Sequence, residues 1–528
     1  MFSRKVSAFF VGILLVAFLF TACLGGGASP NPSSSPTPQT QEQLCKPRQA
    51  KDIDFGVLNS VVATIQRESV FRDIASDPEL LLRGSVERVF AFLTTPVPLW
   101  TNEMVEKELE RSRSFQTTPD FSVLNEIIKR LSQDPQFQDL NDSDQKESLL
   151  KAAVDGIIKT LEDPFAAYVT AEEYQIGALN FSGKYKGLGI SLIRNFKGEI
   201  TLDRVEKGSA AEKAGLVTGD AILEVDGKST SSCTVNQFII EIKTRQNPEL
   251  NIKIRTSSGE EKTIKVMMEE IKQRQVTSCP GVDLPHGRGS STQDLIYTCP
   301  LKDRDGNPVT DIAYIQIKQF SGQAFEDFTE VLRSIDQKSL GGLVIDIRDN
   351  PGGGLHEVTL AVDYFLENAD VIYIEKSEFK NNEPTGATTV ARSDEIDLVD
   401  PKLTVVILVN KNSYSGAELF PAALRDNGRA TIISSDDRTG GKGTINHVFE
   451  LKGGKQGALY IATAIYLTPN GNMVERFDFD KDGYYEIGGI APDIKVNWTS
   501  DDFIENGRNP NYDPTLFEAV EYIRKHLR

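Results

Sequence analysis

The sequence has 528 residues, of which 39% are hydrophobic and 25% are charged, so we expect several folded domains and not a disordered chain. Its formal net charge is −18 and no basic stripe is evident, which argues against nucleic-acid binding. Five cysteines and four histidines are too few and too scattered for a zinc framework.

The first residues indicate export. Arg4 and Lys5 precede a short apolar run, and small residues follow it, so residues 1–22 are predicted to be a secretory signal peptide. The segment Phe20-Thr21-Ala22-Cys23 resembles a bacterial lipobox, with Phe20 in place of the usual Leu. This resemblance implies that Cys23 is lipidated and that the protein is anchored to a membrane of the bacterial cell envelope through that lipid only. Ordinary secretion with a chance cysteine is the alternative.

The chain then changes from a linker to a helical pattern. Residues 23–44 are rich in Gly, Pro, Ser and Thr and are predicted to form a flexible tether. Residues 45–180 are predicted to form a helical domain, because apolar residues recur at three- and four-residue spacing in 144–161. Asp163-Pro164 ends that helix, since the residue before proline avoids helical geometry.

Residues 181–271 alternate like strands, with a short capped helix at Ser209–Leu216 and a hairpin turn at Asp226-Gly227. The ordered motifs Gly187-Leu188-Gly189-Ile190, Gly208–Leu216 and Gly219–Gly227 make this segment resemble a PDZ domain. The resemblance implies an α+β, partly open barrel. It also implies that Gly187, Leu188, Gly189 and Ile190 bind the carboxylate of a peptide tail.

Residues 272–311 are polar and irregular and are interpreted as an inserted loop. After lipidation of Cys23, four cysteines remain, which allows three pairings. A Cys279–Cys299 disulfide is the simplest of them, with two free thiols as the alternative.

Residues 312–498 alternate apolar strands with helices, which predicts an α/β core on a largely parallel sheet. Strands are expected at 312–317, 342–347 and 403–409, and residues 499–528 are expected to form a helical tail.

Two loops directly follow buried strands of this core, where open α/β sheets place their active sites. One contains Pro351-Gly352-Gly353, whose glycines can expose N–H groups. The other contains Ser415 and Gly416 at a strand-to-helix corner, which can expose a hydroxyl beside an N–H donor. A structural turn and a helix N-cap serine are the alternatives. Downstream, Lys442 lies between glycines, and a lysine in a dry site can serve as the base of a serine nucleophile.

Together these motifs resemble the carboxyl-terminal processing, or tail-specific, serine protease family, from about residue 152 to 493. The resemblance implies a catalytic core of the ClpP/crotonase-like type and cleavage of unfolded or tail-exposed proteins near their carboxyl termini. By it, Ser415 matches the nucleophile and Lys442 the base, Asn446 stands where a Gln usually orients the lysine, and Gly352 and Gly416 match the oxyanion hole. Asp426 matches a further acidic position. No metal and no organic cofactor is expected.

Several alternatives stay open. Residues 478–483 open like a calcium loop but lack its bidentate Glu, since Gly489 stands at that position. His356 or His447 could serve a Ser-His mechanism. A catalytically inactive PDZ scaffold that binds exposed tails is the runner-up function, and homo-oligomerisation is left open.

Overall fold

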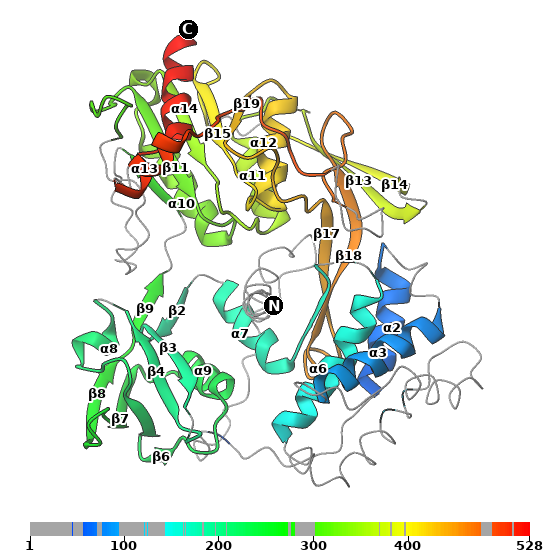
Figure 1. The fold of residues 1–528 in the computed structure, drawn as a ribbon, viewed down its shortest axis with the longest axis vertical. Coiled ribbons are helices and arrows are strands. Elements are labelled where there is room, and N and C mark those ends of the chain that lie inside the picture. Colours follow the sequence, from blue (N-terminus) through cyan, green and yellow to red (C-terminus); the bar gives the residue numbers. More distant parts are fainter. Residues whose placement is uncertain are drawn as a thin grey trace.

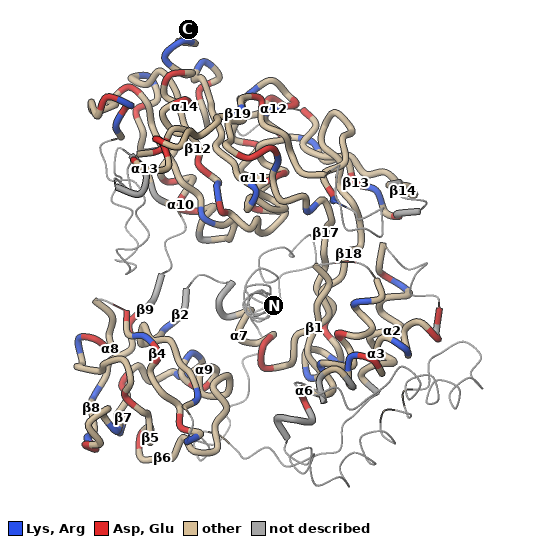
Figure 2. The backbone as a smooth tube through the Cα atoms, in the orientation of Figure 1, with Lys and Arg blue, Asp and Glu red and all other residues tan. Residues whose placement is uncertain are grey.

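A computed structural model of the chain has the fold drawn in Figure 1. The structure describes residues 45, 56–70, 77–93, 121, 124, 143–161, 163, 165–181, 184–195, 197–206, 208–272, 276–279, 301–368, 370–380, 383–394, 398–476, 488–508 and 512–527. Within these ranges no helix combines the length and the apolar character that crossing a bilayer requires. Acidic and basic residues are interspersed along the described chain, and no long basic stretch stands out (Figure 2).

The two predicted loops follow strands of a six-stranded sheet. Its order is β10 (Val276–Cys279), β11 (Ile312–Ile317), β12 (Gly342–Asp346), β15 (Thr404–Leu408), β16 (Thr431–Ser434) and β19 (Ile494–Lys495). Neighbouring strands run parallel except for β10, which is antiparallel to β11. The largely parallel sheet predicted for residues 312–498 is therefore confirmed.

Helices cover both faces of this sheet. Successive side chains of a strand point to opposite faces, so adjacent residues of one strand belong to different buried clusters. Ile345 and Ile407 belong to one buried cluster, which includes residues of α10, α11 and α12. Val344 and Val406 belong to another, which includes residues of α14. These helices are α10 (Gly322–Ser334), α11 (Leu355–Asp363), α12 (Gly416–Asp426) and α14 (Pro514–Lys525), and α13 (Ser500–Arg508) precedes α14.

A second sheet connects this core with the amino-terminal helices. It contains β1 (Ala167–Val169), β18 (Ala458–Leu467), β13 (Val371–Lys380) and β14 (Glu383–Arg392), and β17 (Thr444–Glu450) also pairs with β18. Figure 1 shows β17 and β18 reaching from the parallel sheet to helices α2 (Gly56–Glu68), α3 (Pro78–Leu93) and α6 (Ser143–Lys159). Buried residues of these helices share a core with Leu459 and Ile461 of β18.

Residues 184–272 form a separate small β-rich unit. Its main sheet is β3 (Ile190–Arg194), β4 (Ile200–Val205), β5 (Ala221–Val225), β7 (Glu249–Arg255) and β8 (Glu261–Met267), with β6 (Lys228–Ser229) beside β5. Strands β2 (Lys184–Gly187) and β9 (Glu269–Lys272) pair with each other. Helix α8 (Ala210–Lys213) is capped by Ser209 as expected, α9 (Val235–Thr244) follows β6, and α7 (Ala171–Phe181) precedes β2.

One predicted segment is structured differently than expected, and another is helical as expected but packs into the core. Part of the predicted loop 272–311 forms the edge strand β10, whose Val276 is fully buried in the core. The sequence did not predict β10, because a strand of four residues within a polar segment is too short to show a clear alternation of apolar and polar residues. The predicted tail contains α14, whose Leu516, Val520 and Ile523 bury against the parallel sheet. That helix is therefore a layer of the core and not an appendage.

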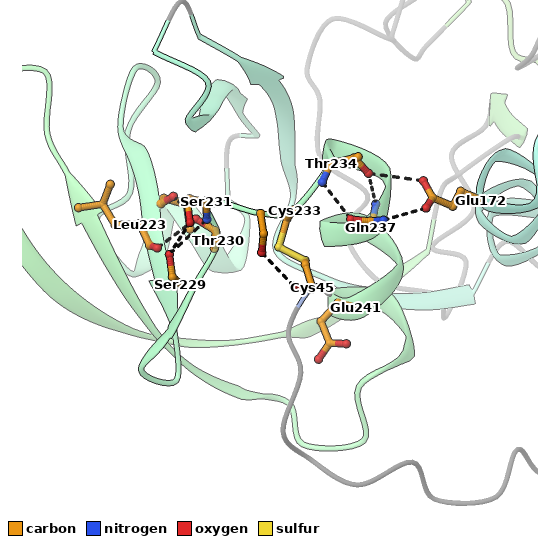
Figure 3. Close-up of a disulfide and its surroundings, with 12 residues drawn as sticks. Cys45, Glu172, Leu223, Ser229, Thr230, Ser231, Cys233, Thr234, Gln237 and Glu241 are labelled. Carbon is orange, nitrogen blue, oxygen red and sulfur yellow. Dashed lines mark hydrogen bonds between the residues drawn. A yellow bond between two sulfur atoms is a disulfide. The ribbon is translucent and has the colours of Figure 1, made fainter. Parts of the chain in front are cut away.

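The described disulfide joins Cys45 to Cys233, which precedes α9 (Figure 3). Ser232 Oγ also donates to the carbonyl of Cys45 at 2.9 Å. Cys45 is thus covalently tied to the small β-rich unit. Cys299, the partner expected for Cys279, lies outside the described residues, as do Cys23 and the acidic segment 478–483.

Candidate active site

Ser415 lies at a tight corner between β15 and α12. It has φ 55° and ψ −118°, a left-handed backbone conformation that is uncommon for a residue with a side chain and is often found at functional sites. Ser415 is 8% exposed. The position after it must be small, because a Cβ on Gly416 would lie 2.7 Å from Val358 Cγ2.

The glycine turn after β12 packs directly against this corner. A Cβ on Gly352 would lie 2.8 Å from Ser415 Cβ, and one on Gly353 would lie 1.8 Å from the carbonyl oxygen of Phe320. The N–H of Gly352 donates to Asn350 Oδ1 at 2.7 Å. For the N–H groups of Gly353 and Gly416 there is no hydrogen bond to another described residue. The N–H of Gly352, which was predicted to be an oxyanion-hole donor, is therefore already bonded to Asn350. The N–H of Gly353 is the one in this turn that could bind an oxyanion.

Lys442 is only 5% exposed. Its Nζ donates to Asn446 Oδ1 at 2.8 Å and to the carbonyl of Thr444 at 3.2 Å. The structure thus brings together Lys442 and Asn446, as the sequence predicted. Among the described residues no hydrogen bond joins Lys442 Nζ to Ser415 Oγ. Such bonds are often long in enzymes without substrate.

A buried carboxyl group connects the serine to the lysine. Glu418 Oε2 accepts hydrogen bonds from the backbone N–H groups of Ser415 at 2.8 Å and of Lys442 at 2.7 Å. Its Oε1 accepts from the N–H of Gly441 at 2.7 Å and from Thr439 Oγ1 at 2.5 Å. Burial raises the pKa of Glu418, and these hydrogen bonds oppose that shift. One carboxyl group therefore fixes the Ser415 corner and the segment that carries Lys442, the two halves of the site, relative to each other.

Tyr466 of β18 makes a second connection. Its hydroxyl lies 3.1 Å from the carbonyl oxygen of Ser415 and 3.0 Å from that of Lys442. Sequence reasoning missed both Glu418 and Tyr466. The spacing Ser415-x-x-Glu418 is a capping-box pattern and could have drawn attention to Glu418, whereas nothing in the sequence singles out Tyr466.

Two more buried carboxyl groups surround the lysine. Glu475 Oε2 accepts from the N–H of Gly443 at 2.6 Å, and burial raises the pKa of Glu475 to about 8, with Lys442 opposing the shift. Burial also raises the pKa of Asp163, which Lys442 again opposes. Lys442 therefore lies in an enclosed, acidic environment.

A small pocket opens at Ser415. Residues from both loops, from β17 and from β18 line it: Gly353, Leu355, Ser415, Gly416, Leu419, Thr444, Ile445 and Tyr466. Its side-chain lining is mostly apolar, with the serine and glycine backbone at one wall. Such a pocket could hold a small apolar side chain of a bound peptide, with the adjoining carbonyl group of that peptide near Ser415.

Neither histidine has the contacts of a base for Ser415. His356 is exposed on α11. His447 Nδ1 lies 2.7 Å from Thr463 Oγ1 on the neighbouring strand, and no carboxylate among the described residues contacts its ring. Asp426 contacts Arg425 and the N–H of Asn470 at the end of α12, which supports a structural contribution.

In the small β-rich unit, the predicted peptide-binding loop lies between β2 and β3. Gly189 has φ +72°, and a Cβ there would lie 2.4 Å from Ser209 Cβ, so only glycine fits. Strand β3 ends the main sheet and pairs only with β4 among the described strands. Gly187 therefore ends β2, Leu188 and Gly189 form the turn, and Ile190 begins the edge strand β3.

Comparison with known proteins finds two family profiles in the chain. The profile "Peptidase family S41" matches residues 311–496 and the profile "PDZ domain" matches residues 179–255. The chain is 26% identical over 380 residues to a probable CtpA-like serine protease of Staphylococcus aureus strain N315, covering 72% of this chain and 65% of that protein. It is 28% identical over 391 residues to a carboxy-terminal-processing protease of Bartonella bacilliformis, covering 73% and 76%.

Among solved structures, the photosystem II D1 C-terminal processing protease aligns over 83% of this chain and 91% of its own, with 17% identity and a TM-score of 0.39.

Proposed function

We infer the activity of this chain from its family, since it belongs to the carboxyl-terminal processing serine proteases and carries their peptidase family S41 and PDZ domains. We propose that it is a serine endopeptidase that cleaves unfolded or tail-exposed proteins near their carboxyl termini.

One observation carries this proposal. A single buried carboxylate oxygen of Glu418 accepts the backbone N–H groups of both Ser415 and Lys442. Two separate segments of the chain are thereby joined through one side chain. Ser415 lines the pocket together with Gly353 and Gly416, and Lys442 shares its Glu418 acceptor oxygen. A nucleophile, a base and paired oxyanion donors are the parts that acyl transfer requires.

In the proposed mechanism, the neutral amine of Lys442 takes the proton of Ser415 as Oγ attacks the scissile carbonyl carbon. The N–H groups of Gly353 and Gly416 stabilise the resulting oxyanion. The Lys442 ammonium then protonates the leaving amine as the peptide bond breaks. A water molecule, deprotonated by Lys442, hydrolyses the acyl-enzyme and restores the Ser415 hydroxyl.

Asn446 is proposed to orient the base. Its Oδ1 accepts from both Lys442 Nζ and Thr444 Oγ1, so the amine is held at a defined place. The asparagine side chain is one carbon shorter than the glutamine usual in the family, and here the Lys442 side chain reaches it. These groups supply the nucleophile, the base and the oxyanion donors, so the proposed chemistry requires neither a metal nor an organic cofactor.

The PDZ unit is proposed to select the substrate tail. The turn Gly187–Ile190 would present backbone N–H groups to the terminal carboxylate, and the free edge of β3 would pair with the extended tail. The signal-like amino terminus supports a location in the bacterial cell envelope, with Cys23 as the lipid anchor.

The test compares cleavage by the full-length protein with that by its Ser415→Ala variant, using an unfolded protein with an apolar tail and mass spectrometry of the products. We expect Ser415→Ala to bind the tail but to cleave nothing, while His447→Ala, the matched control, keeps most activity. A wild-type protein that binds tails yet cleaves no faster than Ser415→Ala would instead support the inactive PDZ scaffold.

A further inference from the structure

An aromatic residue from outside the peptidase domain lies against the proposed base. Phe165 follows α6, well before the matched residues 311–496. Its ring centroid is 5.1 Å from Lys442 Nζ. The same ring meets Tyr414, the neighbour of Ser415, edge-on at a centroid distance of 6.5 Å. One side chain therefore lies against both the proposed base and the neighbour of the proposed nucleophile.

Phe165 has little to do with the hydrophobic cores. It is partly exposed and belongs to none of the buried apolar clusters of the described chain or to the side chains packed against them. The ring contacts described for it are those with Lys442 and Tyr414. Packing of the fold alone does not account for an aromatic side chain at this position.

The backbone that carries Phe165 is nevertheless firmly held. Asp163 Oδ1 accepts the N–H of Phe165 at 2.9 Å, and its Oδ2 accepts the N–H of Ala462 at 3.4 Å. Ala462 is the residue of β18 that pairs with Asn446 of β17. Through Asp163, the backbone of Phe165 is thus attached to the part of the β17–β18 hairpin that carries Asn446, the amide partner of Lys442.

The chemistry of the base explains why a ring is useful there. Lysine has a long flexible stem and a strongly hydrated ammonium, and contact with water favours its charged form, which cannot accept a proton. An apolar ring excludes water and limits the positions of the amine. The attraction of the ring for an ammonium works in the opposite direction, but it is worth only about 0.5–1 kcal/mol at partly exposed sites and is weaker for Phe than for Trp.

We propose that Phe165 is a positioning residue, whose ring shields the Lys442 amine from water and restrains it beside Ser415. The amino-terminal helical segment thereby completes a catalytic site that the peptidase domain does not build alone. This inference rests on the proposed Ser415–Lys442 activity.

The test uses the full-length protein and measures kcat and KM for a tail-bearing substrate, together with the thermal unfolding midpoint. Phe165→Ala should lower kcat about 10- to 100-fold, the range that a small misplacement of a catalytic group can produce. KM should change less than about twofold, because the ring acts on the base and not on tail binding. Phe165→Leu should regain most of kcat, since it restores apolar cover.

Phe121 provides the matched control, because it is 2% exposed in the core of the amino-terminal helices. Phe121→Ala should lower the unfolding midpoint and leave kcat per folded molecule unchanged. Wild-type kcat in Phe165→Ala, or a kcat that falls only with the folded fraction, would overturn the proposal. So would a rise in KM at constant kcat. If the wild type cleaves no faster than Ser415→Ala, the proposed function itself fails and this inference falls with it.

Discussion

Replacement of Glu418 by alanine should disconnect the two halves of the site. Glu418 is fully buried, and its two oxygens accept the backbone N–H groups of Ser415, Gly441 and Lys442 and the hydroxyl of Thr439. Alanine removes both acceptor oxygens and supplies no polar atom to replace them.

The expected magnitude follows from the donors left behind. Each buried N–H that loses its acceptor costs about 1–3 kcal/mol, so three of them cost about 3–9 kcal/mol. This is a large part of the roughly 5–15 kcal/mol by which domains are stable. Glu418→Gln keeps the volume and one acceptor oxygen. If that oxygen faces Ser415 and Lys442, the amide leaves the N–H of Gly441 unpaired, at about 1–3 kcal/mol.

The assay is urea unfolding at neutral pH, followed by kcat per folded molecule for each variant. Glu357→Ala is the matched control, because Glu357 also lies in the first turn of a helix but its Oε2 has no hydrogen-bond partner in the part of the chain that the structure describes. That change should cost less than about 1 kcal/mol. A Glu418→Ala protein as stable and as active as the Glu357→Ala protein would refute the reasoning.

Burial raises the pKa of Glu475 from 4.5 to about 8, so the folded state binds this proton more tightly and the stability it contributes is lost as pH rises from about 4.5 to about 8. Glu475→Gln should therefore flatten the pH dependence of urea unfolding by up to about 1.4 kcal/mol per pH unit, and an unchanged slope would contradict this. Cys45→Ser with Cys233→Ser should lower stability by about 2–4 kcal/mol, and reductant should have no further effect on that double variant in the same unfolding assay. Gly189→Ala should weaken binding of a free-acid tail peptide by about tenfold or more, measured by fluorescence anisotropy, while an amidated peptide binds both proteins equally weakly.

The sequence was informative where the chemistry is local. The corner Ser415-Gly416 after a buried strand, and the glycines on both sides of Lys442, identified two residues whose backbone N–H groups share one acceptor oxygen of Glu418. The loop at Gly187–Ile190 was identified through its resemblance to a PDZ domain, and Gly189 has the positive φ that favours glycine there. Asn446 was identified through the family pattern, and its hydrogen bond to Lys442 is seen in the structure.

What the sequence missed depends on contacts between distant segments. Phe165, Asp163 and Glu475 contact or surround Lys442 only because β1, β17 and β18 pair in one sheet, and no local pattern encodes that pairing. The choice between Gly352 and Gly353 depends on the Asn350 side chain, which takes the first N–H. The cysteines permitted several pairings, and only the fold determines which Cα atoms are close enough to be bridged.

The central claim is that Lys442 takes the proton of Ser415. The most direct measurement is the cleavage rate of an unfolded, apolar-tailed protein by purified wild type, Lys442→Arg, Lys442→Ala and His447→Ala. Arginine keeps the charge but does not release its proton in proteins. We predict that both Lys442 variants lose essentially all cleavage, while His447→Ala keeps most of it. Substantial cleavage by Lys442→Arg, or its loss in a folded His447→Ala protein, would contradict the account.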